Sequence, residues 1–292
     1  MTFASKVKNE ICKQEIESIC CARAQLAGIV CFAAHIRVNS LIIKTESKAV
    51  LNQAVSLIKH LYHLSAETTK SAGGIYSISL FGAEATKVLR DMKLSSVPIR
   101  IDSSIVRREC CKRAFVQGAF LGGGSISDPL KGYHAEFVTS RFGISDGFSK
   151  LLCSFGIMVK VVNRKGNYVF YIKESGQIED LLAVLSAHAC MMGFVNIKIE
   201  KELRNTTNRL VNCENANSEK RAEASVAQKH AILALDKKIG LDNLPPQLAQ
   251  LAKMRLENPE AALSDFAAEL GITKSGVNHR MRRIIQMANE RK

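Results

Sequence analysis

Two pairs of adjacent cysteines carry the most reactive side chains in this sequence. They are Cys20-Cys21 and Cys110-Cys111, and thiolates of this kind can hold zinc. Adjacent cysteines are nevertheless a poor spacing for zinc, because neighbouring side chains on a helix point in different directions. We therefore expect both pairs to be small apolar residues buried at the starts of two helices, and we predict neither a metal site nor a cofactor.

A second set of side chains, near the C-terminus, has the chemistry of a DNA contact. A recognition helix reads base edges from its N-terminal turns, while basic neighbours hold the phosphates. We predict base contacts from Ser275, Asn278 and His279, and backbone contacts from Lys274, Arg280, Arg282 and Arg283. The alternative interpretation is an ordinary amphipathic helix. A metal site at His279 is not expected, since no second ligand sits at metal spacing from it.

A third set forms a basic stretch in the middle of the chain. Its members are Arg100, Arg107, Arg108, Lys112 and Arg113. A run of charge is often no more than a solvated face, so two interpretations stay open. The last four residues either form a second DNA surface or are simply exposed to water.

The C-terminal polar residues would be positioned by a helix-turn-helix. Ser264 is expected to cap a short helix over Asp265–Leu270, Gly271 to supply the turn, and Thr273 to cap a second helix over Lys274–Ala288. One face of that second helix is apolar and is predicted to be buried: Val277, Met281, Ile284 and Ala288. The predicted DNA contacts would then lie on its other face and flanks.

The cysteine pairs belong to an internal repeat. Residues 20–36 read CCARAQLAGIVCFAAHI and residues 110–126 read CCKRAFVQGAFLGGGSI, with six identities at a single offset. Small residues in both copies, Gly28 and Gly118 among them, would let two helices approach closely. The repeat favours a pseudo-twofold domain over two unrelated glycine-containing helices.

The segments after each copy also correspond, because alternating and helical hydrophobic patterns follow in the same order. Hairpins are predicted over Ala34–Ser47, Ala66–Phe81, Gly124–Ser140 and Met158–Lys173. Helices are predicted over Lys48–Leu64, Ala83–Lys93, Ile144–Phe155 and Ile178–Ala187. The expected fold class is therefore α+β, with an αββαββα repeat followed by an all-α domain.

This pattern resembles the LAGLIDADG family of homing endonucleases, through the stretches LAGIVCFAA and VQGAFLGGG and the repeated order of elements. The resemblance implies two sheets that saddle DNA and an acid at the eighth motif position of each copy that holds divalent metal. Ala33 and Gly123 stand at those positions, and neither can coordinate Mg²⁺. Asp128 has Val38 as its repeat mate, so no acid pair replaces the lost one. We expect no catalytic residues and no enzyme activity.

The whole chain resembles the WhiA family. The similarity runs through TFASKVKNEI, CCKRAFVQGAFLGGGSISDP, KGYHAEFV and RNTTNRLVNCENANSEK, and the C-terminal segment is similar to region 4 of bacterial sigma factors. What this resemblance implies is a DNA-binding transcriptional regulator of cell division and chromosome segregation, and of sporulation where the organism sporulates. A protein partner in transcription or division is a further implication.

The expected domains are a first repeat half with an N-terminal helix over residues 1–97 and a second half over residues 98–195. A linker over residues 196–240 and a helix-turn-helix domain over residues 241–292 follow. Five asparagines fall within Arg204–Lys220. Because asparagine favours turns, we expect a turn-rich hinge there, with a contact surface as the alternative.

Composition supports a partner that is a polyanion. The 41 Lys and Arg against 27 Asp and Glu give a formal charge of +14, and 47% of residues are hydrophobic. Nine cysteines without a scaffold spacing, no signal peptide and no long apolar stretch lead us to expect a cytoplasmic protein at the nucleoid, outside any membrane. An active nuclease and a nucleoid-associated or division-scaffold protein with weak sequence specificity remain the alternatives.

Overall fold

The computed structural model of the protein describes residues 1–16 and 18–290. Glu17 lies outside the described residues, as do Arg291 and Lys292 at the end of the expected helix-turn-helix domain. The chain divides into two compact units, Met1–Lys201 and Glu202–Lys292. Among the described residues, no helix is both long enough and apolar enough to cross a bilayer.

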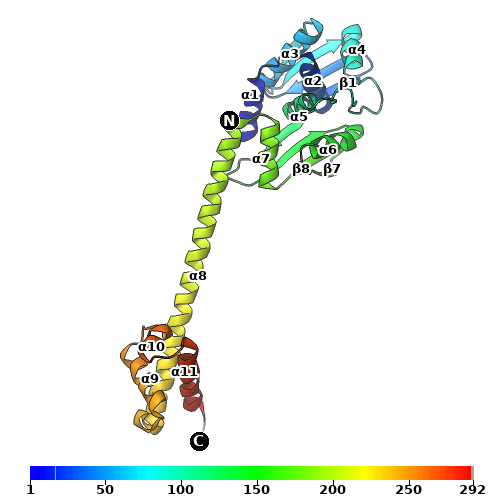
Figure 1. The fold of residues 1–292 in the computed structure, drawn as a ribbon. Helices are drawn as coiled ribbons and strands as arrows, with labels where there is room; N and C mark the ends of the chain where they lie inside the picture. The colour runs from blue at the N-terminus through cyan, green and yellow to red at the C-terminus, as the bar shows by residue number, and fades with distance from the viewer. Residues whose placement is uncertain (17, 291–292) are drawn as a thin grey trace. The chain divides into compact units, whose positions relative to one another are not determined.

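The first unit begins with a helix and one repeat half (Figure 1). Its elements are α1 (Phe3–Cys12), α2 (Ile19–Ala33), β1 (Ala34–Arg37), β2 (Ser40–Thr45), α3 (Lys48–Tyr62), β3 (Glu67–Lys70), β4 (Tyr76–Phe81) and α4 (Gly82–Asp91). The strands form an antiparallel sheet in the order β1-β2-β4-β3. Both predicted hairpins and both predicted helices of this half are present, with ends that differ by a few residues.

The second half repeats this arrangement with the same topology. Its elements are α5 (Glu109–Gly123), β5 (Gly124–Ile126), β6 (Ala135–Thr139), the 3₁₀ helix η1 (Phe142–Ile144), α6 (Ser145–Cys153), β7 (Lys160–Arg164), β8 (Asn167–Ile172) and α7 (Ser175–Val184). The sheet order β5-β6-β8-β7 matches that of the first half strand for strand. The predicted α+β class and the αββαββα repeat are therefore confirmed.

The two motif helices, α2 and α5, pack against each other through glycines. A Cβ at Gly28 would collide with the carbonyl oxygen of Phe115 and lie 2.7 Å from the amide nitrogen of Ala119, while one at Gly118 would strike the carbonyl oxygen of Gln25. Only glycine permits backbones to come this close. Residues further along α2 contact residues further along α5, so the two helices run in the same direction. Their N-terminal ends therefore lie together, and so do their C-terminal ends.

A buried amide network crosses the same interface. The Gln25 side chain donates to Oε1 of Gln117 (3.2 Å) and accepts from Gln53 (2.8 Å). Gln117 in turn donates to Oε1 of Gln14 (3.0 Å) and to the carbonyl of Leu185 (3.2 Å). Because both buried glutamines are partnered, the network fixes how the halves are oriented without leaving unpaired polar atoms.

Aromatic rings fill the core of the second half. Phe148 lies 4.8 Å from Phe32, 5.0 Å from Phe137 and 5.1 Å from Phe170, measured between ring centroids. These rings join α6, the inner face of the second sheet and the end of α2 in one apolar cluster. This packing holds the C-terminal end of α2 rigidly on the second sheet.

The expected turn-rich hinge is wrong, because Arg204–Lys220 lies within one helix, α8 (His188–Ile239). Two threonines there, Thr206 and Thr207, donate their hydroxyls to carbonyls four residues earlier, of Glu202 and Leu203. The residues predicted as a linker, 196–240, therefore have regular structure, and the end of α8 contributes Ile232 and Leu235 to the second core.

The second unit completes its core with three short helices and one 3₁₀ turn. They are η2 (Leu241–Asn243), α9 (Pro246–Glu257), α10 (Leu263–Glu269) and α11 (Lys274–Asn289). The predicted cap at Ser264 is wrong, since the cap is Ala262, whose amide donates to Oδ2 of Asp265 (2.9 Å). Gly271 supplies the turn as predicted, and its φ of 60° lies in the left-handed region.

Candidate nucleic-acid interface

Helix α11 has one face in the core and one in solvent. Val277 and Ile284 are 0% exposed and Met281 is 1% exposed, while Ala288 closes the same stripe one turn later. These are the four residues predicted to be buried, at the helical spacing that the sequence showed. The opposite face is consequently fixed outward by the packing of α11 on α9 and α10.

That outward face carries the predicted DNA contacts. Of these seven residues, Arg280 is half-buried. The other six are exposed: Lys274, Ser275, Asn278, His279, Arg282 and Arg283. No residue of α11 is acidic, whereas α10 contains Asp265 and Glu269. The face therefore presents cations and neutral polar groups together, which is the combination that a recognition helix needs.

The N-terminal turn of α11 is held in place by its own cap. The hydroxyl of Thr273 accepts a hydrogen bond from the amide of Gly276 (3.1 Å), as the sequence predicted. The remaining free amides of this turn and the positive end of the helix dipole face the same solvent region as Lys274 and Ser275. A phosphate at that end would meet favourable charge.

A buried arginine, Arg255, fixes the loop that precedes the helix-turn-helix. Its guanidinium lies 4.5 Å from the centroid of the Phe266 ring and donates from Nη1 to the carbonyls of Pro259 (3.1 Å) and Ala261 (2.7 Å). Burial lowers the pKa of this guanidinium from its usual value, although arginine stays charged in proteins. Arg255 belongs to α9, and no local sequence pattern indicated this role.

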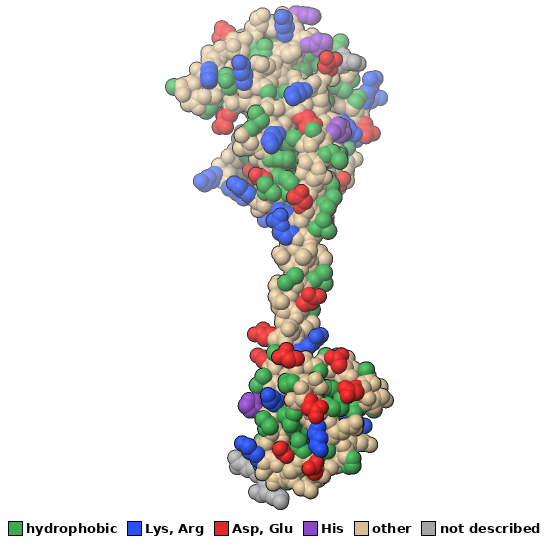
Figure 2. All heavy atoms as spheres, turned by 90° about the vertical axis from the view of Figure 1, so that its left-hand side faces the viewer, with side chains coloured by type: hydrophobic (Ala, Val, Ile, Leu, Met, Phe, Trp, Pro, Cys, Tyr) green, Lys and Arg blue, Asp and Glu red, His purple; other side chains and the backbone are tan. Residues whose placement is uncertain are grey.

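Acidic side chains are unevenly distributed over the second unit. The face of this unit in Figure 2 shows several acidic side chains between the basic ones, and it is the side on which α9 and α10 lie in Figure 1. Some acids there are paired, as in the ion pair between Asp242 and Lys253 (2.8 Å). An acid-free helix surface is thus a property of α11 rather than of the unit as a whole.

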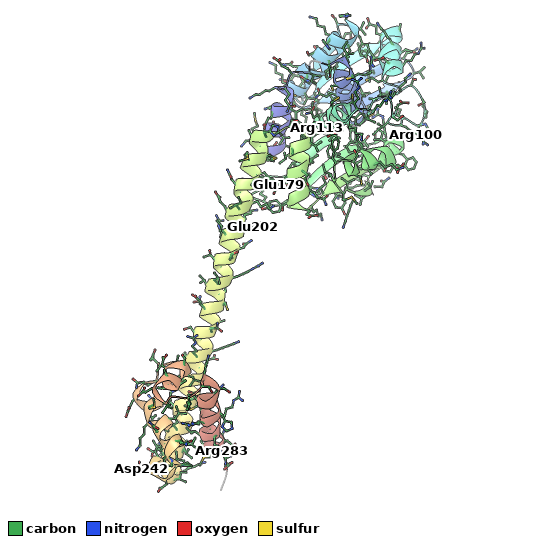
Figure 3. The ribbon with its side chains drawn as sticks, in the orientation of Figure 1. Arg100, Arg113, Glu179, Glu202, Asp242 and Arg283 are labelled. Carbon is green, nitrogen blue, oxygen red and sulfur yellow. The ribbon has the colours of Figure 1, made fainter. Side chains whose placement is uncertain are left out.

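The predicted second basic surface is only partly exposed to solvent. Arg107 and Arg108 are exposed and Lys112 is half-buried. Arg113, labelled in Figure 3, donates from Nη1 to the carbonyl of Ala183 (3.2 Å) and lies 5.8 Å from the Phe155 ring centroid. These contacts tie α5 to α7 and give Arg113 a packing role that the sequence did not reveal.

The open face of each sheet carries an acidic side chain. One cross-strand row of the second sheet reads Ser125, Glu136, Tyr171 and Lys160, and Glu136 contacts His134 at 3.2 Å. A row of the first sheet includes Glu67 opposite Ser79. Such rows attract phosphates less uniformly than α11 does.

The positions where a LAGLIDADG nuclease has its acids offer no metal site. Ala33 and Gly123 end α2 and α5, and a Cβ at Gly123 would strike the carbonyl oxygen of Val138. Arg141 places its guanidinium at the end of α2, donating to the carbonyls of Cys31 (3.0 Å) and Ala34. A guanidinium thus lies at the end of α2, and the backbone of Val138 closes in on Gly123.

The four paired cysteines are not uniformly buried, contrary to expectation. Cys111 is buried and Cys20 and Cys21 are half-buried, but Cys110 is exposed. Their four sulfur atoms lie within 4.8 Å of one another, across two helices that are 90 residues apart in the sequence. The expectation that adjacent cysteines point apart is wrong, because the sulfur atoms of Cys110 and Cys111 are 3.9 Å apart on the same helix.

Comparison with known proteins covers the whole chain. A model of the WhiA LAGLIDADG-like domain matches residues 112–204, and a model of the WhiA C-terminal helix-turn-helix domain matches residues 207–288. A probable cell division protein WhiA from Alkaliphilus metalliredigens is 37% identical over 310 residues, spanning 99% of this chain and 98% of its own length. The chain belongs to the WhiA family. A second WhiA of the same description, from Clostridium botulinum, is 36% identical and spans 100% of this chain and 99% of its own length.

Solved WhiA structures share the fold. The crystal structure of full-length WhiA from Thermotoga maritima matches with a TM-score of 0.63 at 24% identity, covering 99% of this chain and 98% of that one. The isolated N-terminal LAGLIDADG domain of a WhiA protein matches with a TM-score of 0.53 at 20% identity, covering 63% of this chain and 92% of that one. The predicted membership of the WhiA family and the predicted two-part architecture are both confirmed.

Proposed function

We propose that this WhiA chain binds double-stranded DNA through α11 and regulates the transcription of genes for cell division and chromosome segregation, and of sporulation genes in a sporulating organism. The observation that carries the proposal is the outward face of α11, where cations and neutral polar groups are exposed without any acid on the helix. Base contacts come from Ser275, Asn278 and His279 near its N-terminal end. Arg282 and Arg283, with Lys274 and Arg280, bind phosphates.

The biological setting comes from the relatives. Those that match over nearly the full chain are described as probable cell division proteins, so the regulated process is cell division. The protein works at the nucleoid in the cytoplasm, where its DNA partner lies, and can contact a protein partner of transcription or division there. Arg107, Arg108 and Lys112 remain a proposed second DNA surface, whereas Arg113 is engaged in packing.

The LAGLIDADG-like unit has no nuclease role in this proposal. Ala33 and Gly123 supply no ligand for divalent metal, and the guanidinium of Arg141 at the end of α2 repels such an ion. The unit instead adds affinity or contacts a partner. This proposal holds the chain to be a DNA-binding protein and not an enzyme.

The test is retention of genomic fragments, including the gene's own promoter, at near-physiological salt with excess competitor DNA. We compare the intact protein with the double variant Arg282→Ala/Arg283→Ala. A matched control, Lys220→Ala/Arg221→Ala, removes the same charge from exposed positions of α8. Removing two phosphate contacts should reduce the slope of log affinity against log salt by about 2.

The outcomes separate the hypotheses. Selected fragments that the intact protein and the α8 control retain, and that the α11 variant loses, support a regulator that reads DNA through α11. Uniform retention by all three proteins would refute that assignment and favour a nucleoid-associated protein with little sequence preference. Cut DNA in the presence of Mg²⁺ would refute the loss of nuclease activity.

A further inference from the structure

The cysteine pairs meet at the N-terminal ends of the two motif helices. Helix α2 begins at Ile19 and α5 at Glu109, so each pair occupies the second and third positions of its helix. All four Sγ atoms lie within 4.8 Å of one another, and those of Cys110 and Cys111 are 3.9 Å apart. Among the described residues, no other cluster of three or more His, Cys, Asp or Glu side chains could hold a metal ion.

This geometry is close to that of a closed zinc site. Zinc–sulfur bonds of about 2.3 Å in a tetrahedron place the sulfurs about 3.8 Å apart. The sulfur atoms of Cys110 and Cys111, 3.9 Å apart, already meet this value. All four sulfurs lie within 4.8 Å of one another, so each sulfur has to move by no more than about 1 Å, which small side-chain rotations supply. Four sulfur ligands select a soft metal such as zinc over Mg²⁺ or Ca²⁺.

The surroundings favour the charge that such a site carries. Neither helix has a side-chain cap, because neither Ser18 nor Arg108 bonds the first-turn amides. Two positive helix ends therefore face one cluster of sulfurs, and they partly offset the burial that raises the pKa of the Cys21 and Cys111 thiols. Arg107 and Arg108 are exposed directly before α5 and offset the net negative charge of zinc with four thiolates.

We propose that Cys20, Cys21, Cys110 and Cys111 bind one zinc ion, which joins the N-terminal ends of α2 and α5. Cys110 is exposed, so the ion has a path from solvent, and buried Cys111 anchors it on the protein side. The site lies at the opposite end of the motif helices from Ala33 and Gly123, and so it is separate from the metal position of the nucleases. Its role is structural: it locks the two repeat halves together. The proposal is independent of DNA binding.

The first experiment measures metal in the full chain, purified with a reductant and without chelator. We expect one zinc per chain by elemental mass spectrometry and little iron. Replacing zinc by Co²⁺ should give the visible absorption of tetrahedral thiolate coordination. Zinc-free protein that takes up none when Zn²⁺ is supplied would overturn the proposal, and so would iron in place of zinc.

Variants then assign the ligands. Cys21→Ser/Cys111→Ser removes one sulfur from each helix and should lose zinc, whereas Cys153→Ser/Cys213→Ser, at two exposed cysteines outside the cluster, should keep it. Equal zinc in both variants would overturn the proposal. If the first variant does not fold, Cys20→Ser/Cys110→Ser takes its place. Titration of the intact protein with a mercurial supplies the same information. Zinc should be released as the thiols are modified, in the control variant as in the wild type.

Discussion

At the scale of single residues, α11 separates side chains that read bases from side chains that bind phosphates. Asn278 is exposed one turn into the helix, in the region from which recognition helices reach base edges. Arg282 and Arg283 lie a turn further on, and Arg283 donates to Gln286 (3.1 Å). The first group should therefore set the preferred sequence, and the second should set the salt dependence.

Asn278→Ala is expected to relax sequence preference. A bidentate base contact is worth about 1–3 kcal/mol of discrimination, while the phosphate contacts stay in place. Affinity for the preferred site should fall by this amount with an unchanged salt slope, as measured by fluorescence anisotropy at several salt concentrations. Asn289→Ala, the same change in the last turn of α11, is the control and should bind like wild type. Equal losses in the two variants would argue against base contact by Asn278.

Arg255→Ala is expected to destabilise the second unit without touching the DNA face. The variant leaves the carbonyl of Ala261 without its donor and removes the cation from the Phe266 ring, at a cost on the order of 2 kcal/mol. Urea denaturation followed by circular dichroism measures the loss. Lys253→Ala, at an exposed position of the same helix, should leave the midpoint nearly unchanged. A midpoint for Arg255→Ala equal to that of Lys253→Ala would show that the buried guanidinium contributes nothing.

At the scale of elements, the close crossing of α2 and α5 depends on glycine. Gly118→Ala would drive a methyl group into the carbonyl of Gln25, and the backbones must then separate, at a cost of about 1–3 kcal/mol. Gly193→Ala is the matched control, because nothing lies within 4 Å of a Cβ at this exposed position of α8. It should stabilise the helix by about 0.5–1 kcal/mol. Thermal melts of the two variants should thus shift in opposite directions; a shared direction would contradict the close contact.

The sequence predicted the helices and strands better than the contacts between them. Local periodicity placed the hairpins and both faces of α11, and the internal repeat placed the motif helices. The asparagines within Arg204–Lys220 led to a wrong prediction of turns. No glycine or proline interrupts this segment, and its residues with good helix propensity, such as Arg204, Arg209 and Leu210, outweigh the asparagines. Two tertiary contacts had no local signal, because each joins segments about 90 to 110 residues apart: Arg141 at the end of α2 and the meeting of the cysteine pairs.

At the scale of the whole molecule, two cores account for the packing of the described residues. The first runs from Val7 to Phe194 and the second from Ile232 to Ala288, and they share no residue. Each belongs to one compact unit. The formal charge of +14 belongs to the chain as a whole, but the acid-free helix α11 is part of the second core alone.

Separate cores predict separate unfolding. Calorimetry of the full chain should show two transitions, with Gly118→Ala lowering the midpoint of one and Arg255→Ala that of the other. In the double variant the shifts should add, because the two residues share no contacts and lie in different cores. A single transition that both variants lower would mean instead that the units unfold together. Zinc supplied to metal-depleted protein should raise only the transition that Gly118→Ala lowers, because the cysteine cluster lies on α2 and α5.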